Sequence, residues 1–150
     1  MLFGTERDQM RTVFIRAWRK FRAGGSLAGV EPMVVDIALR HPGYHAVLDN
    51  PEAYEEHDLD SRAAQSNAFL HIGLHIAIHE QRSTDRPPGI RAAYHALRSR
   101  LDDAHAVEHR LMDGLEQTLW HAQRDGRDPS ASNYLECVAR IWSGTNPRCE

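Results

Sequence analysis

Apolar residues recur every three to four positions through most of this 150-residue chain. That period is typical of amphipathic helices that direct one face toward a core. The first such segment runs from Met10 to Phe21, where the steps between apolar residues alternate between three and one. There is no alternating strand pattern, internal repeat or low-complexity tract, so the sequence predicts an all-α fold.

Proline, glycine and capping residues divide this pattern into segments. We expect a first helix that ends before Gly24, a second over 32–40 and a short third helix to about residue 48. Further helices are expected over 68–82, 90–101 and 104–124, with a last one around 134–142. A long polar loop is expected over 49–62. The prediction is a single domain over residues 1–150, a bundle of five to six helices with a buried central helix, and a flexible tail over 146–150.

The segment from Ala68 to Arg82 is apolar on nearly every face except for a row of histidines. A helix that is apolar all round is normally surrounded by protein, which makes this segment the predicted central helix. His71 and His75 stand one turn apart on it, about 6 Å along the axis. A single metal ion spans that distance.

A second histidine pair, His105 and His109, lies on the predicted helix over 104–124, and Glu108 falls within the apolar stripe of that helix. Buried imidazoles and carboxylates need partners, because leaving one unpaired costs about 1 to 3 kcal/mol. A shared cation would satisfy several of them at once, and imidazole suits transition metals such as zinc or iron. The sequence therefore predicts a transition-metal site, with one or two ions, whose ligands are His71, His75, His105, Glu108 and His109. For His41 and His45 two roles stay open: they complete a second metal position, or their imidazoles cap a helix end.

Two hypotheses about function follow from these residues. A metal ion with an open coordination position would bind a small molecule, or would activate water with Glu108 as the general base. The alternative is a non-enzymatic interaction or regulatory protein whose core histidines form only a structural hydrogen-bond network. His79, His95 and His121 are expected at the surface or at the boundary of the core.

Composition restricts the function classes further. The net charge of −3 argues against nucleic-acid binding, although the first helix is locally basic. No apolar run reaches the roughly 18 residues that a membrane span needs, and the N-terminus lacks the apolar centre of a signal peptide. Two cysteines, Cys137 and Cys149, do not make a disulfide framework. We expect a cytoplasmic protein with a small-molecule ligand, while the oligomeric state is not indicated.

Several sequence motifs resemble those of one bacterial family. They are His41-Pro42-Gly43-Tyr44-His45, the stretch 67–78, Asp85-Arg86-Pro87-Pro88-Gly89-Ile90, His105-Ala106-Val107-Glu108-His109 and Leu119-Trp120-His121-Ala122-Gln123-Arg124. In order and spacing, they resemble the family named domain of unknown function 1841 over nearly the whole chain. The resemblance implies no reaction, but it implies that the shared polar positions are His41, His45, His71, His75, His105, Glu108 and His109.

Overall fold

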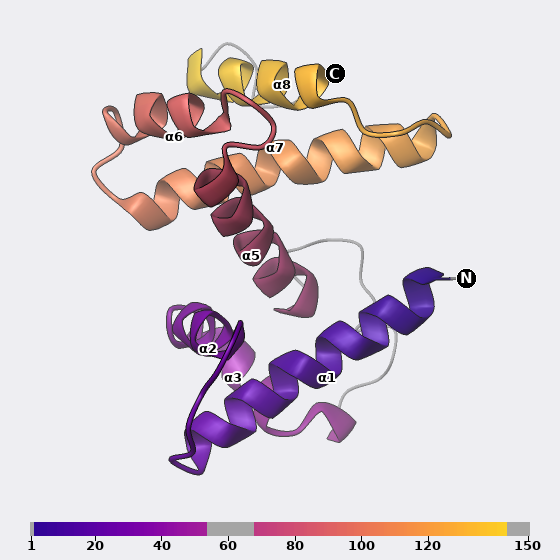
Figure 1. Cartoon of the computed structure of the whole chain (residues 1–150), viewed down its shortest axis with the longest axis vertical. Coiled ribbons are helices and arrows are strands. Elements are labelled where there is room, and N and C mark those ends of the chain that lie inside the picture. The colour runs from indigo at the N-terminus through magenta and orange to yellow at the C-terminus, as the bar shows by residue number, and fades with distance from the viewer. Residues whose placement is uncertain (1, 54–67, 144–150) are drawn as a thin grey trace. The chain divides into compact units, whose positions relative to one another are not determined.

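The structure, a computed structural model, describes residues 2–53 and 68–143. Within these ranges the chain forms seven α-helices and two short 3-10 helices, with no strand (Figure 1). The predicted all-α fold is confirmed. The number of helices is slightly higher than the expected five to six. The expected tail and most of the expected loop lie outside the described residues.

The chain divides into two compact units, Met1–Ile76 and Ala77–Glu150. The boundary falls inside one helix, α5 (Ala68–Thr84), so each unit contains part of it. The prediction that this segment is buried is confirmed at Phe69, Ile72, Leu74 and Ile78. None of the described helices is long and apolar enough to cross a membrane.

Unit 1 is built on the long helix α1 (Leu2–Arg22), which ends before Gly24 as predicted. Helix α2 (Glu31–Leu39) and helix α3 (His45–Asp49) pack against it (Figure 1). The 3-10 helices η1 (Pro42–Tyr44) and η2 (Pro51–Ala53) flank α3. The predicted stop before Pro42 is confirmed, because α2 ends three residues earlier and a new helix begins at the proline. The core of unit 1 contains Phe14, Ala17, Trp18, Val34, Val35, Ile37, Ala38, Val47, Leu48, Ala68, Phe69 and Ile72.

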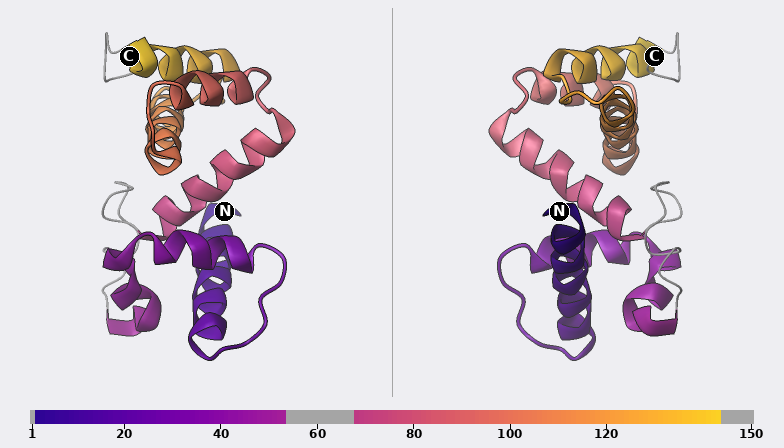
Figure 2. Two further views of the ribbon diagram at one scale, coloured as in Figure 1. Left: turned by 90° about the vertical axis from the view of Figure 1, so that its left-hand side faces the viewer. Right: turned by 90° about the vertical axis from the view of Figure 1, so that its right-hand side faces the viewer.

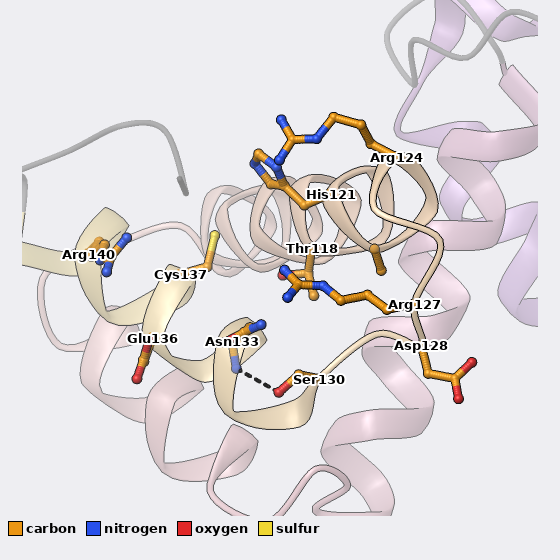
Figure 3. Close-up of a pocket in the computed structure, with 11 residues that line it drawn as sticks. Thr118, His121, Arg124, Arg127, Asp128, Ser130, Asn133, Glu136, Cys137 and Arg140 are labelled. Carbon is orange, nitrogen blue, oxygen red and sulfur yellow. Dashed lines mark hydrogen bonds between the residues drawn. The ribbon is translucent and has the colours of Figure 1, made fainter.

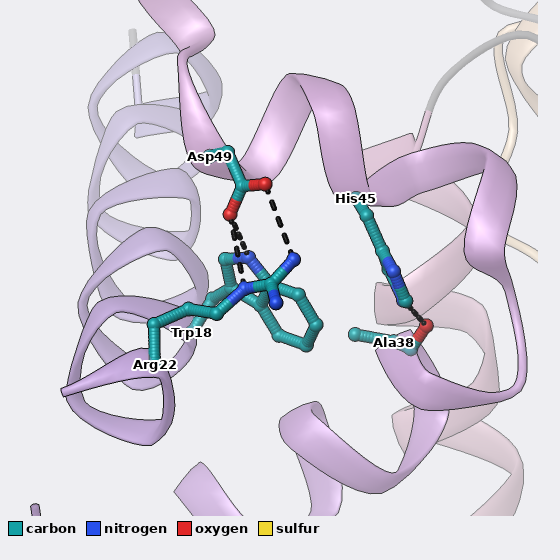
Figure 4. Close-up of polar contacts among 5 residues, drawn as sticks. All are labelled: Trp18, Arg22, Ala38, His45 and Asp49. Atoms are coloured by element: carbon teal, nitrogen blue, oxygen red, sulfur yellow. Dashed lines mark hydrogen bonds and ion pairs between the residues drawn. The ribbon is translucent and has the colours of Figure 1, made fainter. Parts of the chain in front are cut away.

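Asp49 ties the end of α3 to α1. The indole Nε1 of Trp18 donates a hydrogen bond to Asp49 Oδ1 at 2.6 Å (Figure 4). Arg22 donates to both oxygens of the same carboxylate, at 3.3 and 3.2 Å, and its guanidinium lies 4.7 Å from the centre of the Trp18 ring. The carboxylate of Asp49 therefore binds both Trp18 and Arg22 of α1. The ion pair of Asp49 with Arg22 lies at the edge of the core.

These contacts predict a loss of stability in acid. The hydrogen bond from Trp18 and the contacts with Arg22 lower the pKa of Asp49 below its ordinary value. A carboxylate with a lowered pKa stabilises the fold above its unfolded pKa, about 4, and this contribution is lost as the pH falls through the folded pKa. Urea unfolding at pH 6 and at about pH 2.5 compares the free energy of unfolding on the two sides of this titration. Between these pH values, we expect Asp49→Asn to lose less stability than the wild-type protein. Asp36→Asn, in an exposed ion pair with Arg40, is the control. Equal losses for wild type and Asp49→Asn would contradict the prediction.

Unit 2 contains the second part of α5, with α6 (Ile90–Arg98), α7 (Ala104–Arg124) and α8 (Ala131–Ser143). Helices α6, α7 and α8 pack against one another, as both views of Figure 2 show. The backbone of α7 approaches α8 closely at Gly114, where an added Cβ would lie 3.1 Å from a methyl group of Val138. The buried apolar residues of these three helices are Ile90, Tyr94, Leu97, Val107, Leu111, Met112, Ala122, Tyr134 and Val138.

The turns of unit 2 follow the expected breaks. Gly89 precedes α6 with φ of 101°, a left-handed conformation that glycine adopts without strain. The predicted bend before the histidine helix is confirmed at Asp103, whose carboxylate accepts the backbone N–H of His105 at 3.0 Å and caps α7. Helix α6 ends at Arg98, three residues before the predicted end.

Candidate metal centre

In unit 1, His71 and His75 lie one turn apart on α5, and their ring centroids are 4.9 Å apart. The side chain of His71 is 9% exposed and that of His75 is 1% exposed. The expectation that α5 buries both imidazoles is confirmed. Any ion that they bind is therefore largely shielded from water.

His41 brings a third imidazole to this pair. It lies between α2 and η1, and its Nδ1 is 2.7 Å from the carbonyl oxygen of Ile37. Because a carbonyl only accepts, Nδ1 of His41 carries the proton, and the neutral ring therefore has its lone pair on Nε2. That Nε2 lies 2.9 Å from Nε2 of His71. A backbone acceptor at one ring nitrogen is the usual way in which proteins orient a histidine toward a metal ion.

The three rings form one cluster, which we call the His41 cluster, made of His41, His71 and His75. The ring of His41 lies 4.5 Å from that of His71 and 5.0 Å from that of His75, measured between centroids. Tyr44 closes one side, with its ring 5.4 Å from His41 and 5.5 Å from His71. Burial raises the pKa of Tyr44, so its hydroxyl stays protonated at neutral pH. The cluster therefore combines three imidazoles with a neutral phenol.

His45, the other histidine of this segment, occupies a different environment. Its Nε2 lies 2.7 Å from the carbonyl oxygen of Ala38, and its ring packs on Trp18 at 4.6 Å (Figure 4). This contact occupies one ring nitrogen, and among the described residues His45 is not in the group of histidines that could hold a metal ion. His45 therefore links α3 to α2 and α1.

In unit 2, His105 and His109 lie one turn apart on α7, with ring centroids 4.2 Å apart. Glu108 is buried, and its Oε1 lies 2.7 Å from Nε2 of His79 on α5. The His79 side chain is 37% exposed, which fits the expected boundary position. Sequence reasoning missed the pairing of His79 with Glu108. The signal was present, because His79 continues the four-residue spacing of His71 and His75.

A comparison with known families identifies relatives of this chain. A family model described as "Domain of unknown function (DUF1841)" matches residues 6–140. The chain belongs to this family. No curated protein and no solved structure matches the chain. The description of DUF1841 names no reaction.

Among the residues that the structure describes, the histidines grouped by ligand distance as able to hold a metal ion are His41 and His75 in unit 1 and His105 and His109 in unit 2 of this DUF1841 chain. Within each of these pairs, the ligand atoms lie within 4.8 Å of each other. A donor set made of neutral imidazoles favours zinc, iron, copper or nickel over magnesium or calcium. Both units of the protein therefore contain histidine nitrogens whose chemistry suits a transition metal.

Proposed function

We propose that this DUF1841 protein binds a transition-metal ion, zinc or iron, through its histidines, and uses it for small-molecule binding or metal-dependent chemistry. The observation that carries the proposal is the orientation of His41. Its Nδ1 is held by the Ile37 carbonyl, and its Nε2 is directed at His71. Two nitrogens bound to one tetrahedral ion at 2.0–2.1 Å stand about 3.3 Å apart, so the two Nε2 atoms, now 2.9 Å apart, need to separate by only a few tenths of an ångström to share one.

Burial supports the same proposal. Placing imidazoles in an apolar environment costs free energy unless each ring nitrogen finds a partner. One divalent cation satisfies the ring nitrogens of the whole His41 cluster together, and the three remaining ring N–H groups then need only an acceptor each. Three histidines with an open fourth position are typical of zinc sites that bind and activate water.

His105 and His109 are the second proposed ligand pair, and Glu108 lies between them in sequence. Its carboxylate, held by His79, is the proposed general base for a water molecule on the metal. The sequence-based expectation that both histidine pairs share one cation stays a prediction. The number of ions bound per chain tests it.

A structural hydrogen-bond network is the second candidate. It is favoured by the contacts that already satisfy some of the expected ligands, since Glu108 pairs with His79 and His45 pairs with the Ala38 carbonyl. The contact between His41 and His71 also has the length of an N–H···N hydrogen bond. In this hypothesis the histidines stabilise the two units, and added metal would bind weakly or not at all.

Metal titration separates the two hypotheses. Purified protein without an affinity tag is treated with a chelator, dialysed, and titrated with Zn²⁺ by calorimetry and with Co²⁺ by visible absorption. We expect at least one ion per chain and Co²⁺ bands typical of nitrogen ligands. We also expect a rise in melting temperature of about 5 to 10 °C at 100-fold excess of metal over Kd. If neither ion binds or raises the melting temperature, the metal proposal is wrong and the network hypothesis stands.

A further inference from the structure

Unit 2 contains a cavity of about 270 Å³, where the end of α7, the turn that follows it and α8 meet (Figure 3). Each of the three segments contributes one arginine: Arg124 from α7, Arg127 from the turn and Arg140 from α8. The cavity is slightly smaller than the roughly 300 Å³ at which sites for drug-sized ligands begin. Its volume therefore suits a small metabolite.

Two of these arginines pair with the same carboxylate. Asp125 accepts a hydrogen bond from Nε of Arg124 at 3.0 Å and pairs with Nη2 of Arg127 at 3.4 Å. The guanidinium of Arg124 also lies 5.1 Å from the centre of the Trp120 ring. Asp125 thus positions two guanidinium groups at one cavity.

The polar groups around the cavity favour an anion. Figure 3 shows the guanidinium of Arg127 directed toward Thr118, while the carboxylates of Asp128 and Glu136 point away. The beginning of α8 also lines the cavity. There the hydroxyl oxygen of Ser130 accepts a hydrogen bond from the backbone N–H of Asn133 at 3.3 Å. A helix N-terminus carries partial positive charge and is a common site for phosphate groups.

We propose that this cavity binds a small phosphate monoester. Arg127 binds the phosphate near the N-terminus of α8, Arg124 approaches it from the side of His121, and the hydroxyl of Thr118 and the amide of Asn133 contact the remainder of the ligand (Figure 3). A phosphate dianion accepts hydrogen bonds from two separate guanidinium groups, whereas a single arginine fork already satisfies one carboxylate.

The sulfur of Cys137, which also lines the cavity, is disulfide-bonded. It offers no thiol to a ligand, and the proposal is therefore one of binding and not of thiol chemistry. Disulfides are rare in a reducing cytoplasm. The expected cytoplasmic location accordingly stays a prediction.

Calorimetry with ribose 5-phosphate, compared with ribose and with succinate, tests the phosphate site. We expect ribose 5-phosphate to bind and ribose not to bind, with an affinity that falls as salt is added. Arg127→Gln should weaken binding by about tenfold or more, because it removes one charged donor. Arg110→Gln is the matched control, since Arg110 is an exposed arginine of α7 that does not line the cavity.

A second measurement uses the indole of Trp120, whose ring contacts both Arg124 and His121. Its fluorescence should change on addition of ribose 5-phosphate, and the change should be absent in Trp120→Phe. The proposal is overturned if ribose 5-phosphate does not bind, if succinate binds as tightly, or if Arg127→Gln and Arg110→Gln have equal effects. None of these outcomes depends on whether the histidines bind metal.

Discussion

Replacing His75 with alanine is expected to weaken zinc or cobalt binding by this DUF1841 protein by more than about 100-fold. His75 is 1% exposed, and its ring faces both His41 and His71. Loss of a residue that only orients a ligand already lowers metal affinity by about 10- to 100-fold, and loss of a ligand itself costs more. The measurement is the Kd from competition with a chelator of known affinity, together with the metal content by elemental analysis.

The segment from His41 to His45 supplies a test variant and its matched control. His41→Ala should weaken metal binding like His75→Ala, because His41 directs Nε2 at His71. His45→Ala, four residues away, should retain the metal affinity, because its ring packs on Trp18 and its Nε2 contacts Ala38. Circular dichroism verifies that each variant is folded. Equal metal affinity in the His41 and His45 variants would reject the His41 cluster as the ligand set.

His109→Ala in the same assay tests the expectation of a shared cation. If the two histidine pairs bind the same ion, loss of His109 should remove as much metal as loss of His75. If each pair binds an ion of its own, half of the metal should remain. The exposed His95 is the negative control, and His95→Ala should bind metal like the wild-type protein.

The helices of this protein could be predicted from sequence because their signals are local. The three-to-four-residue period gave the helices, and Pro42, Gly89 and Asp103 placed breaks that the structure confirms. Helix ends were less predictable. The pattern of apolar residues continues to Leu101, but α6 ends at Arg98. Apolar periodicity reports which face is buried, whereas the last hydrogen-bonded turn depends on the local backbone.

The histidine pairs of α5 and α7 were also predictable, since a spacing of four residues places two rings on one helix face. The position of His41 beside His71 was not predictable. It depends on a backbone carbonyl four residues before it and on a contact with His71, thirty residues away. The phosphate site proposed in unit 2 is similarly hidden, because it requires the turn between α7 and α8 to bring Arg124 and Arg127 to one carboxylate. Contacts between distant segments are set by tertiary packing and have no periodic signal.

Replacing Trp18 with alanine is expected to lower the free energy of unfolding by about 3 to 5 kcal/mol. The indole is 1% exposed in the core of unit 1 and packs on His45 and Phe21, with ring centroids 4.6 and 5.5 Å away. Removing it leaves a large cavity and takes away the hydrogen bond to Asp49. The measurement is urea unfolding of the metal-free protein, so that metal binding does not contribute to the difference.

Trp18→Phe separates the two losses. Phenylalanine keeps most of the ring in the core but donates no hydrogen bond to Asp49, whose carboxylate retains the two contacts from Arg22. We expect Trp18→Phe to lower the free energy of unfolding by about 1 to 2 kcal/mol, well below the loss for Trp18→Ala. The reason is that the packing of the ring contributes more than a single hydrogen bond to a partly exposed carboxylate. Trp120→Ala, at a ring that is 50% exposed, should cost less than about 1 kcal/mol. If Trp18→Phe costs as much as Trp18→Ala, the hydrogen bond to Asp49, and not the packing of the ring, determines how strongly α1 and α3 are held together.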